Sequence, residues 1–395
     1  MGLFSVGKYD NYSDDYKGPV TITVCTIIAL GAGVSYAWSV FSVALQDTYG
    51  LSLTEATAPY SISCAVFALC AVIAGFLADR VPPKYVAMFG GLCLGIGVYM
   101  CGSANTAEKL IFPVSLAFGP GNAFIGVTCG STAVKWCSPK RKGLVSGVVI
   151  SAIALSSLLS SVLAKLFIVT NGVAASFRLL GVLLLFLTVP MSFFIFTPQK
   201  DMEITKKHSV IKEIFSSNFI KLWIVYMIGL MAGHTVISQI GNIGLYQIGE
   251  INVAGFTAVI AVGNMIGRLS LATLSDKIGC KKTYYLAYCL CALNIGLFFL
   301  YKNSSLLYMG SFISGFCYGG LISNSSAALA GLFGKANFAL LWGVMQSSAG
   351  ISGTVGPMLA ASAFEHFGDY YIAYFGSCVI IALCITLVRN IYKGK

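Results

Sequence analysis

The sequence predicts an all-α membrane protein with twelve transmembrane helices, arranged as two pseudo-symmetric six-helix bundles with both termini in the cytoplasm. Three observations predict this fold. Hydrophobic residues make up 57% of the 395 positions and charged residues only 10%, whereas a soluble domain carries about 25% charged residues. Apolar runs of about 20 residues, the length needed to cross a bilayer, recur along the chain. One short turn motif also appears twice, half a chain apart.

Strongly polar breaks, such as those at 79–84, 138–142 and 276–282, divide the apolar runs into separate spans. The polar and acidic segment before the first run, which itself continues for a full span length, does not resemble a secretory signal. The predicted spans are 20–43, 56–78, 85–102, 110–134, 144–168, 177–197, 220–243, 252–275, 283–301, 305–332, 338–362 and 370–388.

The distribution of basic residues predicts the orientation. Of the 25 Lys and Arg residues, only Lys109, Lys165, Arg178 and Lys302 fall on predicted outer segments, and Arg268 falls within a span. The remaining twenty fall on inner segments, as the positive-inside rule requires. The net charge of +11 therefore reflects the cytoplasmic loops and does not indicate a nucleic-acid partner.

A repeated turn divides the chain into halves. Gly75-Phe-Leu-Ala-Asp79-Arg80 closes the second span, and Ala272-Thr-Leu-Ser-Asp276-Lys277 closes the eighth, 197 positions later. The polar segment 198–218 between them reads as a cytoplasmic linker between a bundle at 1–197 and a bundle at 219–395. Paired halves of this kind are typical of transporters that rock about a central site. We interpret Asp79, Arg80, Asp276 and Lys277 as gate residues that join and release the halves; capping of the turn is the alternative.

Arg268 is the residue for which we expect a substrate-binding role. It precedes the inner helix end at Asp276 by eight residues, or about 12 Å. A charge at that depth must face the protein interior or a wet cavity. Its planar guanidinium is suited to binding a carboxylate through two hydrogen bonds. The alternatives are that it snorkels to the cytoplasmic headgroups or pairs with backbone carbonyls.

Other polar residues within the spans are candidates to line the same cavity. His234 is the only histidine inside a predicted span, and it could bond a substrate oxygen or carry a proton. A buried histidine that bonds a neighbouring helix is the alternative. Tyr36 and Tyr318 lie too deep for the interfacial aromatic belt. Asn264 and Gln346 are buried amides that either line the pathway or join helices.

The sequence offers no enzyme site. It contains no phosphate-binding GxxxxGK[ST] motif, no paired metal ligands and no nucleophile beside a base. Its 13 cysteines form no CxxC, and we expect them to be buried thiols without a disulfide framework. We therefore expect no enzyme activity, no cofactor and no metal.

These motifs together resemble the major facilitator superfamily over essentially the whole chain, and within it the oxalate/formate antiporters and related monocarboxylate transporters. The repeated turns are similar to the superfamily signature after spans 2 and 8. Tyr36-Ala-Trp38-Ser-Val-Phe41, the basic loop 135–144, Arg268 eight residues before Asp276, and Tyr318-Gly-Gly320 are similar to elements of the antiporter family. The resemblance implies the major facilitator fold and adds Trp38 to the expected substrate-binding residues.

Departures from the family pattern restrict the expected class of substrates. The oxalate exchangers would have a lysine three residues after Trp342, where this chain has Met345, and aromatic residues where it has Gly126 and Ile153. One interior cation suits a monoanion better than a dianion. Monocarboxylate transporters would have an acid at Asn264, so the expected proton-carrying partner of Arg268 is replaced by an amide.

We therefore expect a monomeric, multi-pass protein of the plasma membrane that moves a small monocarboxylate, such as lactate, pyruvate or formate, by alternating access. Proton symport and anion exchange both remain open. The alternatives are an exchanger of oxalate or another dicarboxylate, a sensor that has kept the scaffold without transporting, and a channel. Nitrate is disfavoured, because it would be expected to bring an arginine in the second span.

Overall fold

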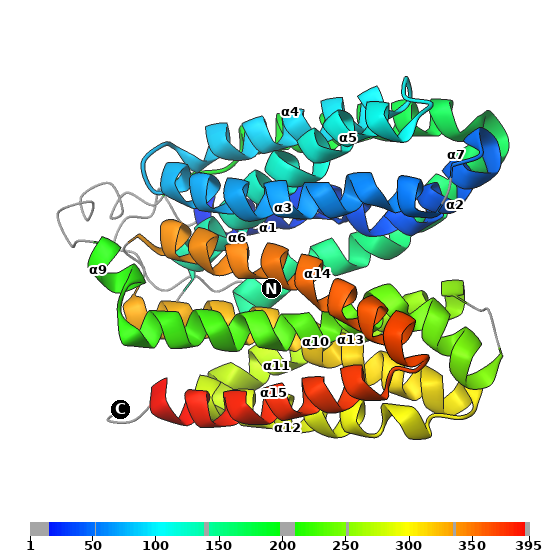
Figure 1. The fold of residues 1–395 in the computed structure, drawn as a ribbon. Coiled ribbons are helices and arrows are strands. Elements are labelled where there is room, and N and C mark those ends of the chain that lie inside the picture. The colour runs from blue at the N-terminus through cyan, green and yellow to red at the C-terminus, as the bar shows by residue number, and fades with distance from the viewer. Residues whose placement is uncertain are drawn as a thin grey trace. The chain divides into compact units, whose positions relative to one another are not determined.

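The computed structural model describes residues 16–51, 53–137, 142–197, 210–249, 253–334 and 337–391 (Figure 1). These residues are helical almost throughout and contain no β-strand, which confirms the predicted all-α class. Helices are expected here because a backbone inside a bilayer must satisfy its N–H and C=O groups within its own segment.

The chain divides into two compact units, the first made of residues up to 208 with 333–350, and the second of 209–332 with 351–395. The predicted halves, 1–197 and 219–395, stay a prediction. Residues 198–209 of the expected linker lie outside the described residues. The remainder of that segment contains the short helix α9 (Val210–Ile214) and the start of α10.

The first unit contains the helices that precede α9. Thr106 caps α5, since its hydroxyl accepts a hydrogen bond from the N–H of Lys109. Pro120 lies in a π-helical turn, η2, where a proline can be accommodated. The elements are α1 (Lys17–Ala32), η1 (Gly33–Ala37), α2 (Trp38–Tyr49), α3 (Leu53–Ala78), α4 (Pro83–Cys101), α5 (Ala107–Leu116), η2 (Ala117–Gly121), α6 (Asn122–Trp136) and α7 (Lys142–Ser192).

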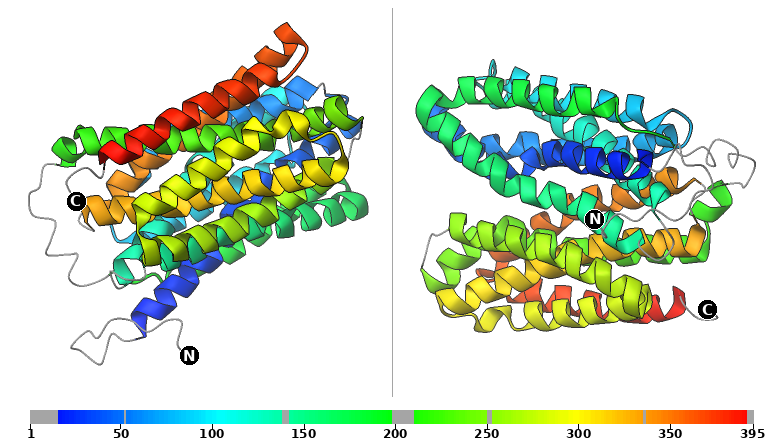
Figure 2. Two further views of the ribbon diagram at one scale, coloured as in Figure 1. Left: turned by 90° about the horizontal axis from the view of Figure 1, so that it is seen from below. Right: turned by 180° about the vertical axis from the view of Figure 1, so that it is seen from behind.

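Helix α7 contains two of the predicted spans and bends between them at Gly172. The backbone of this residue has φ 79° and ψ 169°, a conformation that only glycine adopts readily. The bend divides α7 into two helical parts, which can be followed in Figure 2.

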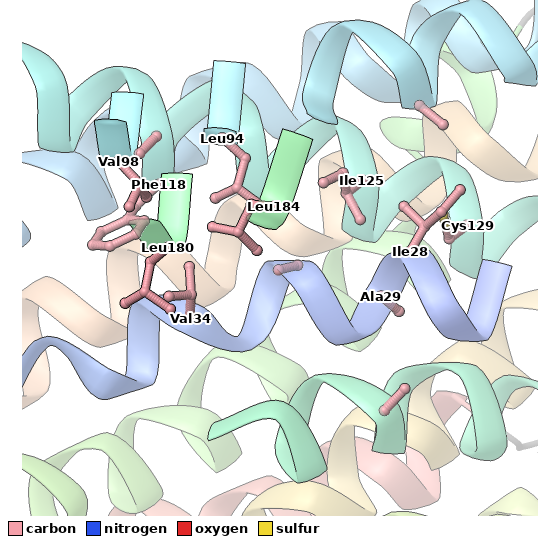
Figure 3. Packing of buried hydrophobic residues seen from close by; sticks show 14 of the residues in the cluster. Ile28, Ala29, Val34, Leu94, Val98, Phe118, Ile125, Cys129, Leu180 and Leu184 are labelled. Atoms are coloured by element: carbon pink, nitrogen blue, oxygen red, sulfur yellow. The ribbon is translucent and has the colours of Figure 1, made fainter. Parts of the chain in front are cut away.

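The core of the first unit is built from apolar side chains of α1, α4, α6 and α7. Leu94 of α4 and Leu184 of α7 lie next to each other above Val34, which follows α1, while Ile28 of α1 faces Cys129 of α6 (Figure 3). All five side chains are buried. Their packing joins the four elements through dispersion contacts and excluded solvent.

The second unit contains α10 (Ser217–Ile248), α11 (Val253–Ile278), α12 (Cys280–Gly296), η4 (Phe298–Leu300), α13 (Ser304–Phe333), the later part of α14 (Phe338–Phe367) and α15 (Tyr371–Ile391). Helix α15 packs against α12 and α10 (Figure 2). Buried Asn294 of α12 donates to the carbonyl of Gly310 and to the hydroxyl of Ser314, so its amide joins α12 to α13.

Large apolar side chains also lie on the outside of both units, as a lipid-facing surface requires. Leu69, Phe186 and Val379 are examples, each at least 60% exposed. By length and composition, nine helical stretches of the described residues can cross a membrane. One of them, 147–192, covers two predicted spans, and α12 and α14, which cover two others, are not among the nine. The number of twelve and the cytoplasmic termini stay predictions.

Candidate functional site

Arg268 lies on α11 with only 2% of its surface exposed, the most buried charge among the described residues. Its Nε donates a hydrogen bond to Oδ1 of Asn264, one helical turn earlier, at 2.7 Å. Residues four apart share one helix face, so the amide can hold the guanidinium along the axis of α11. Asn264 thus touches the guanidinium directly and supplies a neutral acceptor.

Close packing between α11 and α13 forms the wall behind this pair. Gly315 and Gly319 of α13 lie directly on the backbone of Ile260 and Asn264, and a methyl group at either glycine would overlap a carbonyl oxygen. Gly267 of α11 lies in the same way on Phe316 of α13. Small residues on both helices permit this approach, as in other membrane helix pairs.

A second polar group joins α10, α13 and α14. His234 of α10 has its Nδ1 3.1 Å from Oγ of Ser352 on α14, and its Nε2 3.1 Å from the hydroxyl of Tyr318 on α13. The His234 and Tyr318 rings meet edge to face, with centroids 5.0 Å apart. Because both ring nitrogens have partners, the orientation of the imidazole is determined by three helices. Hydroxyl groups can donate or accept, so this network tolerates either tautomer.

Helix α13 brings the two groups to the same level. Tyr318 packs on Gly233 of α10, and its sequence neighbour Gly319 packs on Asn264 of α11. The Arg268–Asn264 pair and the His234 network therefore lie on adjacent sides of one turn of α13. The arrangement combines one fixed positive charge with neutral hydroxyl and imidazole groups, which is suited to a small anion with an uncharged remainder.

The other predicted substrate-binding residues lie in the first unit. Trp38 is buried at the start of α2, where its indole N–H donates to the carbonyl of Ala56 at 3.1 Å and its ring meets Phe118 edge to face. Gln346 lies half-buried on α14, within the part assigned to the first unit. The side chain of Tyr36 lies outside the described residues. The roles of Tyr36, Trp38 and Gln346 stay predictions.

The two predicted gate turns differ in the structure. Asp79 is 7% exposed and bonds Nζ of Lys135 at 3.0 Å. Its carboxylate also accepts hydrogen bonds from the backbone N–H groups of Leu340 at 2.8 Å and Ala339 at 3.4 Å, at the start of α14. An acidic group at a helix N-terminus satisfies unpaired N–H groups and complements the helix dipole. Asp79 therefore joins the C-terminal end of α3 to the beginning of α14.

The remaining gate residues are exposed. The guanidinium of Arg80 lies 3.6 Å from the centre of the Phe76 ring. Asp276 and Lys277 occupy the last turn of α11. The two turns thus share a sequence pattern but have different surroundings.

Two contacting residues, Ser352 and Lys135, were not among the predicted site residues. Serines are common in membrane helices, so nothing in the sequence separates Ser352 from the others. Lys135 carried a signal, because it belongs to the basic loop motif at 135–144. Within the described ranges no three His, Cys, Asp or Glu side chains gather as metal ligands would.

Comparison with known proteins places these observations in a family context. The sequence model of the Major Facilitator Superfamily matches residues 23–300 and, in a second match, residues 242–393. The chain is 24% identical to the uncharacterised MFS-type transporter YhjX of Escherichia coli K12, over 83% of each chain. It is 23% identical to the oxalate:formate antiporter of Oxalobacter formigenes, over 87% of this chain and 84% of that one.

Solved structures show the same architecture. The human organic anion transporter MFSD10 (TETRAN) superposes with a TM-score of 0.78, covering 94% of this chain and 99% of its own. The E. coli fucose:proton symporter FucP superposes with a TM-score of 0.73, covering 94% and 98%. Both are 12% identical to this chain in sequence, so these comparisons show a shared fold alone.

Proposed function

The chain belongs to the Major Facilitator Superfamily, and from that premise we propose that it is a secondary transporter of a small monocarboxylate such as lactate, pyruvate or formate. Transporters of this family are multi-pass membrane proteins and not enzymes. In our proposal residues 1–197 rock against 219–395, so that a site between them opens to either side of the membrane in turn.

The observation that carries the proposal is the burial of Arg268 beside a neutral partner. A guanidinium keeps its positive charge at any physiological pH, and an apolar surrounding strengthens its attraction for an anion. Asn264 accepts a hydrogen bond from it without adding an opposite charge. A substrate carboxylate would bond the guanidinium through charge-assisted N–H groups.

The remainder of the substrate would meet neutral groups. His234 and Tyr318 would form hydrogen bonds with a hydroxyl or keto oxygen of the substrate. The imidazole and the phenol hydroxyl can each donate or accept a hydrogen bond, as their contact with each other requires. Tyr36, Trp38 and Gln346 would complete the cavity. This part of the proposal accounts for small hydroxy and keto acids such as lactate and pyruvate, whereas formate would bind through its carboxylate alone.

Oxalate or another dicarboxylate is the second candidate, and the 23% identity to the oxalate:formate antiporter is the observation in its favour. A dianion would call for a second interior cation. At the position where the resemblance implies one, this chain has Met345, which is fully buried. The single charge of Arg268 therefore favours a monoanion.

The Asp79 contacts support a gating role. The bonds to Lys135 and to the start of α14 would hold the inner side closed and would break when the transporter turns inward. For Asp276 the gating role rests on the repeated sequence motif, because in the structure it is exposed and its surroundings differ from those of Asp79.

Coupling would follow either proton symport or anion exchange. Asn264 takes up no proton, which favours exchange; His234 is the residue that would carry the proton in symport. Uptake driven by internal unlabelled anion without a pH gradient is the result expected for exchange. Uptake that requires an imposed pH gradient would contradict it.

Substitution of Arg268 tests the central assignment. We expect Arg268→Ala in proteoliposomes to take up labelled formate or lactate about 100-fold more slowly than the parent, the loss of roughly 3 kcal/mol expected for a buried charged bond. Arg389→Ala serves as the control, because Arg389 is exposed at the end of α15. Uptake by Arg268→Ala at the parental rate would disprove the site. A parent protein without saturable counterflow of any carboxylate would instead favour the sensor alternative.

A further inference from the structure

Ser323, on α13, is a buried hydroxyl that the predicted site did not include. Its side chain has no exposed surface, and its Oγ has no hydrogen-bond partner among the described residues. Serines in membrane helices commonly donate a hydrogen bond from the hydroxyl to a carbonyl oxygen of the preceding turn, as Ser347 and Ser348 do on α14. A buried hydroxyl without a partner costs free energy. Its presence therefore calls for an explanation.

The packing of α13 against α11 determines which residues Ser323 faces. Gly315 lies on Ile260 and Gly319 on Asn264, so a step of four residues along one helix matches a step of four along the other. The two helices consequently run parallel and in register through this contact. The next step brings Ser323 opposite Arg268.

The direction of the side chains strengthens this placement. In a helix each Cα–Cβ bond tilts toward the N-terminus. Because α11 and α13 run parallel, Ser323 and Arg268 lean the same way along their contact line. The bond from Arg268 Nε to Asn264 confirms this lean for the arginine. The guanidinium reaches back toward Asn264, which lies against Gly319, so this register places the serine hydroxyl within about one helical turn of the guanidinium.

We propose that Ser323 is a second ligand of the transported anion and donates its hydroxyl hydrogen to the carboxylate that Arg268 holds. This inference rests on the proposed function. A neutral donor strengthens binding without adding positive charge, so the site would keep its preference for a monocarboxylate over a dianion. A hydroxyl without a protein partner is also ready to bond the substrate, because no internal bond must break first.

Ser311 provides a matched control. It lies on the same helix, has no exposed surface, and its hydroxyl likewise has no partner among the described residues. It precedes Ser323 by twelve residues, or about 18 Å along the helix axis. Ser323→Ala and Ser311→Ala therefore remove the same group from the same kind of surrounding, one beside Arg268 and one away from it.

The experiment measures initial rates of labelled formate and lactate uptake into proteoliposomes that contain the parent or either variant. We expect Ser323→Ala to raise KM about 10-fold, the effect of losing one hydrogen bond to a charged group. Ser311→Ala should keep the parental KM. Thermal unfolding is measured alongside, and we expect neither variant to melt below the parent, since neither loses a bond within the described protein.

Each outcome decides the proposal. A parental KM in Ser323→Ala, or the same rise in both variants, would overturn the role of Ser323 while the transport function stands. A lowered melting temperature in Ser323→Ala would mean that the hydroxyl supports the fold, and would overturn it as well. A parent that transports neither anion would refute the proposed function, and the ligand role of Ser323 with it.

Discussion

At the scale of single residues, Asn264 determines whether the guanidinium of Arg268 has an acidic partner on its own helix. An acid four residues before the arginine would form an internal ion pair that the substrate carboxylate must displace. Asn264 instead accepts one hydrogen bond at 2.7 Å and carries no charge of its own. In the transport mechanism that we propose, residue 264 therefore takes up no proton before the anion binds.

Asn264→Asp tests this reading. The new carboxylate would lie against the guanidinium and compete with the substrate, so we expect KM for lactate at neutral pH to rise about 10-fold. Protonation of the aspartate would remove the competition, so KM should fall again as the pH is lowered. Uptake kinetics across a pH series provide the measurement. A variant whose KM matches the parent at every pH would show that residue 264 does not set the charge of the site.

At the scale of helices, the contact between α11 and α13 controls the geometry of the site. Gly263 and Gly267 on one helix and Gly315 and Gly319 on the other bring the two backbones into contact. The approach determines both where Asn264 lies and which residue of α13 faces Arg268. Packing between small residues, and not the position of any one side chain, thus determines the register of the polar groups.

Gly319→Ala should separate these helices. A methyl group there would overlap the backbone oxygen of Asn264, which cannot rotate away. We expect a loss of about 1–3 kcal/mol in stability, the usual cost of overpacking, measured as a lower thermal unfolding temperature in detergent. Gly331→Ala is the control on the same helix, because nothing lies within 4 Å of an added methyl there. Equal melting temperatures for the two variants would contradict the packing argument.

At the scale of the whole molecule, the structure distinguishes two turns that are alike in sequence. Asp79 contacts Lys135 and the first backbone amides of α14, whereas Asp276 lies exposed at the end of α11. The first turn therefore joins parts of the chain that are 261 residues apart. Such a contact can couple the early helices to the beginning of α14.

Asp79→Asn should loosen that coupling. The amide retains one acceptor but loses the charge that pairs with Lys135 and complements the helix end. We expect hydrogen exchange at the Ala339 and Leu340 amides to become about 10-fold faster or more. Asp276→Asn, at the equivalent turn, should leave those two amides unchanged. Protection that is unaltered in Asp79→Asn would rule out the cap.

The sequence by itself determined the class of the fold and the place of its unusual charge. Apolar runs and sparse charge follow directly from the bilayer as solvent, because the bilayer acts on each segment locally. The free-energy cost of a buried cation identified Arg268 without any knowledge of its neighbours. Partners in space are a different matter, because they depend on how helices pack. Only the tertiary structure showed Ser352 bonded to His234 across 118 residues and Gly319 packed on Asn264, the contact from which we infer the place of Ser323. The two similar turn motifs likewise could not reveal that Asp79 caps α14, since capping depends on which helix end lies nearby.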